Sequence, residues 1–587
     1  MQSVLARCVV AFATLISLCA MAASQQSLEQ LLAPDPRAFH VDRVCVKLAE
    51  GTDAELRAGE LVSRAGTDLG AVARWFRTAR AEPLVGSVPR AQLDAWHAHA
   101  CAVLPAGRRP GHLGLWFRLR TDGIAASEAL IAALRSEPLV EHVHPEGRFV
   151  PASAEAPRLD DIPPTTPSFT ALQNSHDPTP LGHGARLVAG VFGARGQGIG
   201  LRMIEESYFL GHEDVGKLVA ANFLGPVPIP DAFQSRHALS GCSIVCADRN
   251  IYGITGLADL VAPKFIGMDV SGGFESSLAL ALANSQPGDV VLAVLMLLVP
   301  GLGPGTWLPV EFLQSVFDAT LTVTANGRHV VVPAGNGNRS LDDPALFGRF
   351  DRNFRDSGAI MVGASNAGAL QRASFSNWGA RIDAHSWGAQ VVSCGYGDLF
   401  WPNNDDLQAY TQLATGTSSA TPHIAAVVAA IQGACKRQLG QVLTNQQLLA
   451  ILRTHGATTP DVIGRRTDLA AAFQALGIFD GLAVGSPEVS IGGVIQVAMN
   501  ADSNAIFALA GSFAAVDTPI GLNRNLHLDS ASMAVLGAFL FPAGQASMQI
   551  PVPNNAALHG TSVYLQALRM VPPTSMSLTN SCQVSIL

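Results

Sequence analysis

The sequence predicts an α/β fold in which a parallel sheet is covered by helices on both faces, preceded by a small α+β domain and followed by a β-sandwich-like domain. From residue 183 to 477, strand-like apolar runs alternate with helix-like runs, a pattern typical of a parallel sheet between helical layers. Residues 38–150 mix both patterns, and residues 478–587 contain short strand-like runs separated by turns. A chain of 587 residues is long enough for about three such domains.

The first 22 residues predict a signal peptide. Arg7 precedes the apolar run CVVAFATLISLCAMA, and the triplet AMA at 20–22 fits a small-x-small cleavage site. A buried helix is the alternative interpretation. We therefore expect an exported protein, either extracellular or periplasmic. The other long apolar run, VVLAVLMLLV at 290–299, is too short to span a bilayer and predicts a strand buried on both faces, so we expect no membrane span.

The region 38–150 predicts a compact α+β domain. RVCVKLA and LGLWFRLR alternate like strands, whereas SEALIAALRSEP has helical spacing and precedes the strand-like VEHVHPEGRFV. The stretch PASAEAPRLDDIPPTTPS at 151–168 is rich in Pro and Ser and predicts an exposed linker, and we expect the linker to extend over 151–182.

The region 183–477 supplies the expected sheet and its helices. The runs IGLRMIEE, KFIGMDV, DVVLAVLMLLV, HVVVPAG and AIMVGAS predict strands. The runs HALSGCSIVCA, ESSLALALANS and VEFLQSVFDATLTVTANG predict helices between them. Residues 478–587 predict a C-terminal β-rich domain.

Composition excludes some functions. Apolar residues make up 48% and charged residues 14%, so a large core is expected rather than disorder. The net charge is −8 and no basic stripe stands out, which argues against a nucleic-acid partner.

The cysteines give an ambiguous pattern. Seven of the nine would remain after signal removal, and an odd number leaves at least one free thiol. Cys45 and Cys101 could pair, and Cys242 and Cys246 are neighbours on a predicted helix. Buried unpaired thiols are an equally good interpretation. Neither a CxxC pair nor a Cys/His metal spacing occurs.

Polar residues follow the predicted strands or open the predicted helices at four places. Glu205 ends a strand, His237 begins a helix, Asn336 lies in a Gly-rich turn after a strand, and Ser418 begins the helix of GTSSATPHIAAVVAAI. Ligands of open α/β sheets bind outside the carboxyl ends of the strands, so these four side chains can converge there.

These segments resemble motifs of the subtilisin-like (subtilase) peptidases. GTSSATPHIAA resembles their serine motif, PAGNGN their oxyanion asparagine motif, and GQGIGLRMIEESYFLGHEDV the segment around their acidic residue; FSNWG (375–379) also recurs. The order acid, histidine, serine is that of the family. The resemblance covers 183–477. It implies a subtilisin-like fold, a secreted serine endopeptidase acting on protein or peptide substrates without a cofactor, and an inhibitory propeptide in the region 38–150.

The resemblance also implies a role for each residue. Ser418 would be the nucleophile, His237 its base, Glu205 the acid that orients the imidazole, and Asn336 the oxyanion donor, and the residue types suit this chemistry. Each residue also has a structural interpretation. Ser418 could be a helix cap and His237 a buried core histidine. Glu205 could be a surface carboxylate and Asn336 a turn residue. His423 is expected to be structural.

Three features depart from the family pattern. Glutamate replaces the usual aspartate at 205, as in a branch of bacterial subtilases, with Glu206 and Asp214 as fallback candidates. The histidine motif HGTxVxG reads HALSGCS, so Ala238 and Leu239 change volume beside the base. The segment 295–305 lacks the SxGG stretch on which an extended substrate would normally lie.

Several alternatives stay open. A catalytically impaired subtilase-fold binding protein is the main one, and HALSGC favours it. Sedolisin-type chemistry is disfavoured by His237 and Asn336, and a metal-dependent hydrolase by the lack of HExxH or clustered ligands. Structural calcium is common in the family, yet no acidic loop matches a ligand pattern. We expect a monomer.

Overall fold

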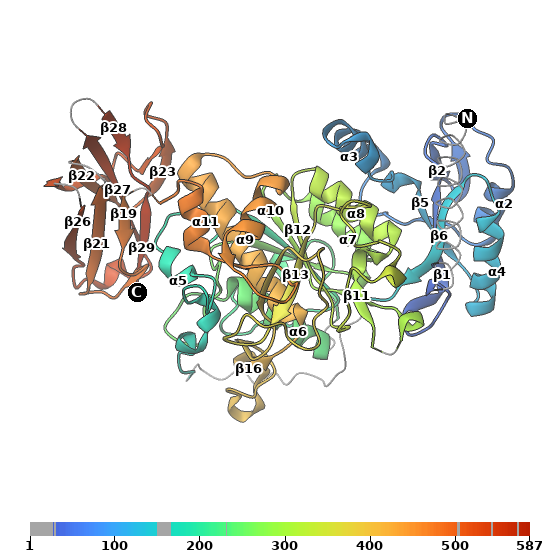
Figure 1. The fold of residues 1–587 in the computed structure, drawn as a ribbon, viewed down its shortest axis with the longest axis horizontal. Coiled ribbons are helices and arrows are strands. Elements are labelled where there is room, and N and C mark those ends of the chain that lie inside the picture. Colours follow the sequence, from blue (N-terminus) through green and yellow to red (C-terminus); the bar gives the residue numbers. More distant parts are fainter. Residues whose placement is uncertain are drawn as a thin grey trace, which may run out of the picture.

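The computed structural model describes residues 28, 31–149, 166–229, 232–303, 305–479, 481–501, 505–541, 544–571 and 575–587. Three bodies lie in a row, with the N-terminal unit at one end, the C-terminal unit at the other and the helix-covered domain between them (Figure 1). The expected signal peptide, 1–22, and residues 151–165 of the expected linker lie outside the described residues.

The N-terminal unit is an antiparallel sheet with helices, in the strand order β4-β5-β1-β6. Its elements are β1 (Phe39–Leu48), β2 (Ala54–Arg57), β3 (Glu60–Ser63), α2 (Gly70–Thr78), β4 (Glu82–Pro83), α3 (Arg90–Val103), β5 (Trp116–Arg120), α4 (Ile124–Arg135) and β6 (Val140–Gly147). Val44, Val46 and Phe117 lie in its apolar core.

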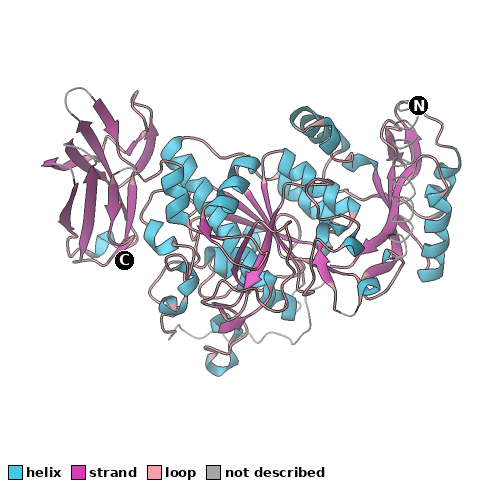
Figure 2. Ribbon diagram, viewed as in Figure 1, coloured by secondary structure: helices cyan, strands magenta, loops and turns pink. Residues whose placement is uncertain are grey.

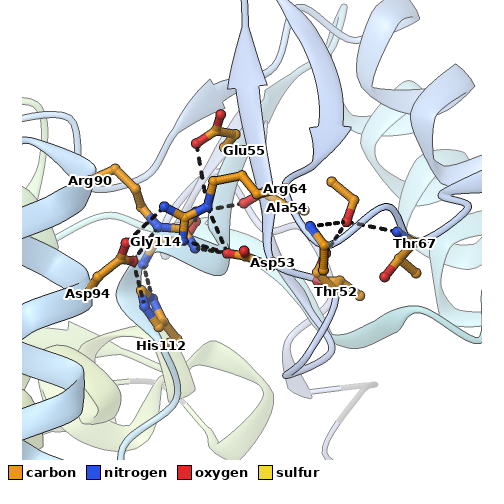
Figure 3. Close-up of polar contacts among 12 residues, drawn as sticks. Thr52, Asp53, Ala54, Glu55, Arg64, Thr67, Arg90, Asp94, His112 and Gly114 are labelled. Atoms are coloured by element: carbon orange, nitrogen blue, oxygen red, sulfur yellow. Dashed lines mark hydrogen bonds and ion pairs between the residues drawn. The ribbon is translucent and has the colours of Figure 1, made fainter.

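A polar network ties α3 to the rest of this unit (Figure 3). Arg90 at the start of α3 donates to Asp94 at 2.8 Å and to the carbonyls of Ala54 at 2.7 Å and Gly114 at 3.0 Å. Asp94 also accepts from Arg64 at 3.0 Å. The guanidinium of Arg90 therefore joins three separate segments of the chain.

The central domain contains a six-stranded sheet in the order β14-β13-β12-β9-β7-β8, and all its neighbouring strands run parallel. The strands are β7 (Gly200–Glu205), β8 (Ala262–Gly267), β9 (Val290–Ala293), β12 (His329–Pro333), β13 (Ile360–Ser365) and β14 (Ala384–Trp387). The helices are α5 (Ala185–Val188), α6 (Ala232–Cys246), α7 (Phe274–Ala283), α8 (Gln314–Ala325), α9 (Thr417–Leu439), α10 (Asn445–Thr454) and α11 (Leu469–Ala475).

Helices cover both faces of this sheet, as the sequence predicted (Figure 1). Along β12, Val331 packs in the core that contains α6 and α9, whereas Val330 and Val332 pack in the core that contains α7 and α8. Successive side chains of a strand point to opposite faces, so burial on both faces explains why the strands are continuously apolar. The predicted α/β fold is confirmed.

The run at 289–299 does not form the single strand that the sequence predicts. β9 ends at Ala293, and the chain leaves the sheet to form β10 (Met296–Leu298), which pairs antiparallel with β11 (Trp307–Pro309). Val294 and Leu295 between the two strands are also buried. Apolar character therefore continues through the break, and periodicity could not reveal it.

Residues 166–182, the remainder of the expected linker, run through short 3₁₀ turns against the central domain. Phe169 and Gln173 are buried, and the Gln173 side chain exchanges two hydrogen bonds of 2.9 Å with the backbone of Thr255.

The C-terminal unit is built of strands (Figure 2). Its two larger sheets are ordered β19-β21-β26 and β20-β29-β27-β22-β25, with β28 paired to β27, and β23 and β24 form a small separate sheet. The two larger sheets share one apolar core. The strands of the unit are β19 (Leu482–Val484), β20 (Glu488–Val489), β21 (Val494–Ala501), β22 (Ala505–Ser512), β23 (Ala515–Thr518), β24 (Leu526–Leu528), β25 (Ala534–Phe541), β26 (Gly544–Pro551), β27 (Ser562–Val571), β28 (Ser575–Leu578) and β29 (Cys582–Ile586).

The cysteines of the described residues all carry free thiols, so the pair Cys45–Cys101 that the sequence left open is not formed. Cys242 and Cys246 are neighbours on α6, with their sulfur atoms 3.6 Å apart. Burial raises the pKa of the Cys582 thiol to about 12, as expected for a small core residue.

Candidate active site

The four polar residues singled out in the sequence lie at one edge of the central sheet, beyond the carboxyl ends of its strands. Glu205 is the last residue of β7, and Asn336 lies in the turn that follows β12. His237 is in the first half of α6, and Ser418 is in the first turn of α9.

Gly241 brings α6 close to α9. A Cβ atom at this position would lie 3.1 Å from Met203 Cε and 3.5 Å from Pro422 Cγ, so the helix passes close to its neighbours here. His237 is one turn before Gly241 on α6, and Ser418 is one turn before Pro422 on α9. The approach of the two helices therefore brings His237 and Ser418 to the same end of the helix pair.

Glu205 and His237 form an isolated pair. Oε1 of Glu205 lies 3.3 Å from Nδ1 of His237, and the glutamate side chain is 1% exposed. In the described part of the chain, Nδ1 and both carboxylate oxygens have no hydrogen-bond partner, so this ion-pair contact is what links them. His237 is thus the group that compensates the buried charge of Glu205.

This pairing shifts the pKa of both groups. Burial raises the pKa of Glu205, against the opposing effect of His237. Burial by itself would lower the pKa of His237, but the negative charge of Glu205 outweighs that effect and the pKa of the imidazole is raised. The carboxylate therefore favours the imidazolium form of His237, the form that a general base reaches when it accepts a proton.

Asn336 is held by the residue that precedes Ser418. Its Oδ1 accepts the backbone N–H of Thr417 at 2.9 Å and the Thr417 hydroxyl at 2.8 Å. With Oδ1 engaged in this way, Nδ2 is directed elsewhere. A Cβ atom at Gly416 would lie 3.3 Å from Asn336 Nδ2 and 2.7 Å from Ser418 Oγ, so both atoms line the same small space.

Gly416 keeps this space open. Its φ is 124°, a conformation that a residue with a side chain rarely adopts. Ser418 is 9% exposed and is the second residue of α9, where its backbone N–H has no carbonyl in a preceding turn. The helix dipole adds positive potential there. Two N–H donors and one hydroxyl thus meet beside a glycine, an arrangement suited to an oxyanion.

Asn377, from the FSNWG segment, fixes the turn that carries Asn336. Its Nδ2 donates to the carbonyl of Ala334 at 2.7 Å and to that of Trp307 at 2.6 Å. Its Oδ1 accepts from the backbone of Gly337 at 3.1 Å. The sequence singled out this segment by resemblance alone. In the structure, the Asn377 side chain holds the turn after β12 against β11.

The remaining polar candidates have other partners. Asp214 accepts from Asn250 Nδ2 and from the Ile254 backbone, both at 2.7 Å, and burial raises the pKa of its carboxyl to about 7. His212 contacts the carbonyl of Ala409 at 3.0 Å. Glu206 follows the last residue of β7.

His423 has both ring nitrogens within hydrogen-bond distance of other groups. Nδ1 lies 2.9 Å from the carbonyl of Ser419, and Nε2 lies 3.0 Å from the hydroxyl of Ser175. Burial lowers the pKa of its imidazole to about 4. These contacts join α9 to the 3₁₀ turn at Asn174–His176.

The unusual residues of the HALSGC segment fit the helix. Ala238 and Leu239 lie inside α6 and are fully buried, and Ala238 does not have a positive φ. A side chain at 238 therefore causes no backbone strain. The glycine that packing requires is Gly241, which this chain has.

The end of the N-terminal unit reaches the active-site edge of the sheet, which sequence reasoning missed. Phe149 forms an antiparallel bridge with Leu297 of β10 and is buried, with its ring 5.3 Å from that of Phe274. The neighbour of Leu297 is Met296, whose Sδ lies 3.8 Å from the hydroxyl oxygen of Thr417. No motif in the sequence indicates this long-range pairing.

Within the described ranges, none of the helices combines the length and apolar character needed to cross a bilayer. Those ranges also contain no group of three or more His, Cys, Asp or Glu side chains arranged to hold a metal ion.

Comparison with known proteins links the central domain to one family. The model of the subtilase family matches residues 302–470, a range that includes Asn336 and Ser418 but begins after Glu205 and His237. The protease domain of PatA, solved as a serine-to-alanine mutant, covers 49% of this chain and 96% of its own length at 16% identity and a TM-score of 0.36.

Curated relatives agree with that family. Subtilisin-like protease 4 of Arthroderma benhamiae is 29% identical over 215 residues, covering 35% of this chain and 46% of the relative. Subtilisin-like protease 2 of Pseudogymnoascus destructans is 28% identical over 232 residues, covering 39% and 49%. The chain therefore spans about half the length of these relatives.

Proposed function

We propose that this chain, a member of the subtilase family, is a secreted serine endopeptidase that hydrolyses peptide bonds of protein or peptide substrates and is made as a precursor with an inhibitory propeptide. The observation that carries the proposal is the convergence of two arrangements at one sheet edge. One is the Glu205–His237 pair, and the other is the space at Gly416 that Ser418 and Asn336 line.

In the proposed mechanism, Ser418 Oγ attacks the peptide carbonyl while His237 accepts its proton. Glu205 keeps the proton of the imidazole on Nδ1 and stabilises the imidazolium. Asn336 Nδ2 and the Ser418 backbone N–H donate to the oxyanion. His237 then protonates the leaving amine, and water hydrolyses the acyl-enzyme by the same steps in reverse. This chemistry uses no cofactor.

The N-terminal unit has the contacts that a propeptide would need. Trp116 Nε1 and the Gly111 backbone both donate to Asp318 of α8 at 3.1 Å, and Ser87 donates to the carbonyl of Ser276 of α7 at 2.8 Å. Phe149 lies on β10, where a substrate strand would add. In the proposal, the unit blocks the cleft until the chain beyond Phe149 is cleaved.

A binding protein without peptidase activity is the second candidate. The described residues include no hydrogen bond between Ser418 and His237, and the Glu205–His237 separation of 3.3 Å is long for a charge-assisted hydrogen bond. These two observations favour impaired catalysis. Catalytic hydrogen bonds often shorten only when substrate is bound, so they are also compatible with an active enzyme.

Labelling with a fluorophosphonate separates the two candidates. The purified protein, free of residues 1–150, would be incubated with the reagent and its intact mass measured, with Ser418→Ala as the matched control. A single adduct on the wild type alone supports the peptidase. A folded sample that gains no adduct would exclude it in favour of the binding protein.

A further inference from the structure

A cavity of about 500 Å³ lies at the junction between the N-terminal unit and the central domain. Residues 140–144 of β6, together with Leu32, line one side of it. The other side is formed by Phe317 of α8 and by the loop at 347–355. Both units are therefore needed to form the cavity, which lies apart from the proposed catalytic residues.

Two half-buried guanidinium groups, those of Arg349 and Arg355, line this cavity. Arg349 Nη1 donates to the carbonyl of Phe312 at 2.7 Å, and its guanidinium lies 5.5 Å from the centre of the Phe312 ring. Arg355 donates to Gln314 Oε1 at 2.8 Å and lies 4.0 Å from the centre of the Phe317 ring. Their partners are neutral carbonyl, amide and aromatic groups.

Neither cation has a carboxylate partner in the described part of the chain. The nearby acids are engaged elsewhere: Asp318 accepts from three neutral N–H groups, and Glu141 pairs with Lys47. Glu311 pairs with Arg381 at 3.1 Å.

Burial lowers the pKa of Arg355 to about 10 and that of Arg349 well below its ordinary value. The charge of Asp318 acts on both arginines and that of Glu311 on Arg355, but burial outweighs them. Because a guanidinium keeps its proton in proteins, these shifts indicate two desolvated cations that nearby carboxylates compensate only in part.

The other walls of the cavity combine apolar side chains with the polar side chains of Arg135, Glu141, His142, His144 and Gln314. Phe347, Val140 and Leu32 contribute to them, and Phe354 is 60% exposed where it borders the cavity. A ligand that fits must therefore bring negative charge to Arg349 and Arg355 and apolar surface to the phenylalanines.

We propose that this cavity binds an amphiphilic carboxylate, with the carboxylate on Arg349 and Arg355 and the apolar group against Phe317 and Phe354. Because the cavity has walls from both units, a bound ligand stabilises the attachment of the N-terminal unit to the central domain. This inference does not depend on peptidase activity, and it is tested on the full chain carrying Ser418→Ala, which keeps the two units on one chain.

Binding would be measured calorimetrically with octanoate as the probe, 1-octanol as its neutral analogue and inorganic phosphate as a bare anion. We expect one octanoate per chain and no saturable binding of octanol. Arg349→Gln and Arg355→Gln should each weaken octanoate binding about tenfold or more, because each removes a charge-assisted hydrogen bond. Arg108→Gln is the matched control, since Arg108 donates to the carbonyl of Arg352 across the same junction without lining the cavity. It should leave octanoate affinity unchanged.

Further variants keep the test decisive if an Arg→Gln variant does not fold. Arg349→Lys retains the charge, and Phe354→Ala should weaken octanoate while leaving phosphate affinity unchanged. Phosphate that binds as tightly as octanoate, with no effect of Phe354→Ala, would overturn the amphiphilic ligand. Equal octanoate affinity in the wild type and the arginine variants would overturn the site.

The chain itself contains a competing carboxylate, because Glu29 lies between two lining residues, Leu28 and Leu32, in the sequence. Octanoate binding that occurs only in Glu29→Gln would overturn the proposal in favour of an internal counter-ion. Binding of the same strength in Glu29→Gln and in its parent supports a free ligand.

Discussion

The two halves of the candidate active site are held in place in different ways. Asn336 and Ser418 are fixed by short hydrogen bonds of 2.8 and 2.9 Å through Thr417, and the turn beneath them is fixed by Asn377. Glu205 and His237 depend on a single ion-pair contact of 3.3 Å, and in the described residues no hydrogen bond to the carboxylate or to Nδ1 orients the pair. One half is thus defined by backbone geometry and the other by one electrostatic interaction.

This difference matches where the sequence keeps and loses the family pattern. The serine and asparagine motifs are complete, whereas the acidic and histidine segments carry Glu205 and HALSGC. The half with several anchors tolerates little change, because Thr417, Asn336 and Asn377 are held there by hydrogen bonds. The residues around the Glu205–His237 pair can be substituted, provided that the carboxylate still reaches the imidazole.

Ser418→Ala should have the largest effect, because it removes the proposed nucleophile from the well-anchored half. We expect protein hydrolysis to fall by about 10⁶, the loss measured for the corresponding change in subtilisin. Casein hydrolysis and the intact mass of the precursor would both be followed. Activity that survives this substitution would rule out Ser418 as the nucleophile. It would also contradict the assignment of the nucleophile to the well-anchored half of the site.

Glu205→Gln should have the next largest effect, since among the described residues Glu205 is the partner of His237 Nδ1. We expect kcat to fall by about 10⁴, as for other triads that lose their acid. The active form of His237 is neutral and its pKa is raised, so the acid limb of kcat/KM for the wild type should lie above pH 6.5.

The same variant should shift the pH profile. Without the charge of Glu205, burial alone acts on His237 and lowers its pKa, so the acid limb should move below pH 6.5. Residual activity of Glu205→Gln would be measured from pH 4 to 9. Glu205→Asp is the matched control: it keeps the charge, so the limb should stay above pH 6.5 although the rate falls. A limb that does not move in Glu205→Gln would show that Glu205 is not the partner of the base.

Asn336→Ala should lower the rate by about 10²–10³, a magnitude taken from the oxyanion asparagine of subtilisin. The effect should appear in kcat with little change in KM, because the donor acts on the transition state. Steady-state kinetics on a peptide substrate would show this. A change confined to KM would assign Asn336 to substrate binding instead.

Thr417→Val should have the smallest effect. It removes the hydroxyl that donates to Asn336 but keeps the backbone donor, so about 1 kcal/mol of anchoring is lost and kcat should fall about fivefold. The double variant Thr417→Val/Asn336→Ala should be no slower than Asn336→Ala alone. An additive loss would mean that Thr417 does not act through Asn336.

Much of the fold could be predicted from the sequence, because burial on both faces leaves a clear signal in each parallel strand. The four candidate residues could also be singled out, since Glu205 ends β7, Asn336 follows β12 and Ser418 lies in the first turn of α9. The prediction that His237 begins a helix was wrong, because α6 already begins at Ala232. The break between β9 and β10 left no signal, because Val294 and Leu295 at the break are buried and apolar like the strand before them. The docking of Phe149 on Leu297 and the cavity beside Arg349 arise from contacts between distant segments, which local patterns do not encode.

Helix α9 connects the C-terminal unit to the candidate nucleophile. Its 23 residues measure about 35 Å at 1.5 Å per residue, with Ser418 in the first turn and Gln438 in the last. Gln438 is buried and donates to the carbonyls of Phe192 and Ser581 at 2.8 and 3.0 Å, so the β-rich unit is fastened to the far end of the helix. The C-terminal unit therefore fixes the position of the C-terminal end of α9, the helix whose N-terminal end carries Ser418.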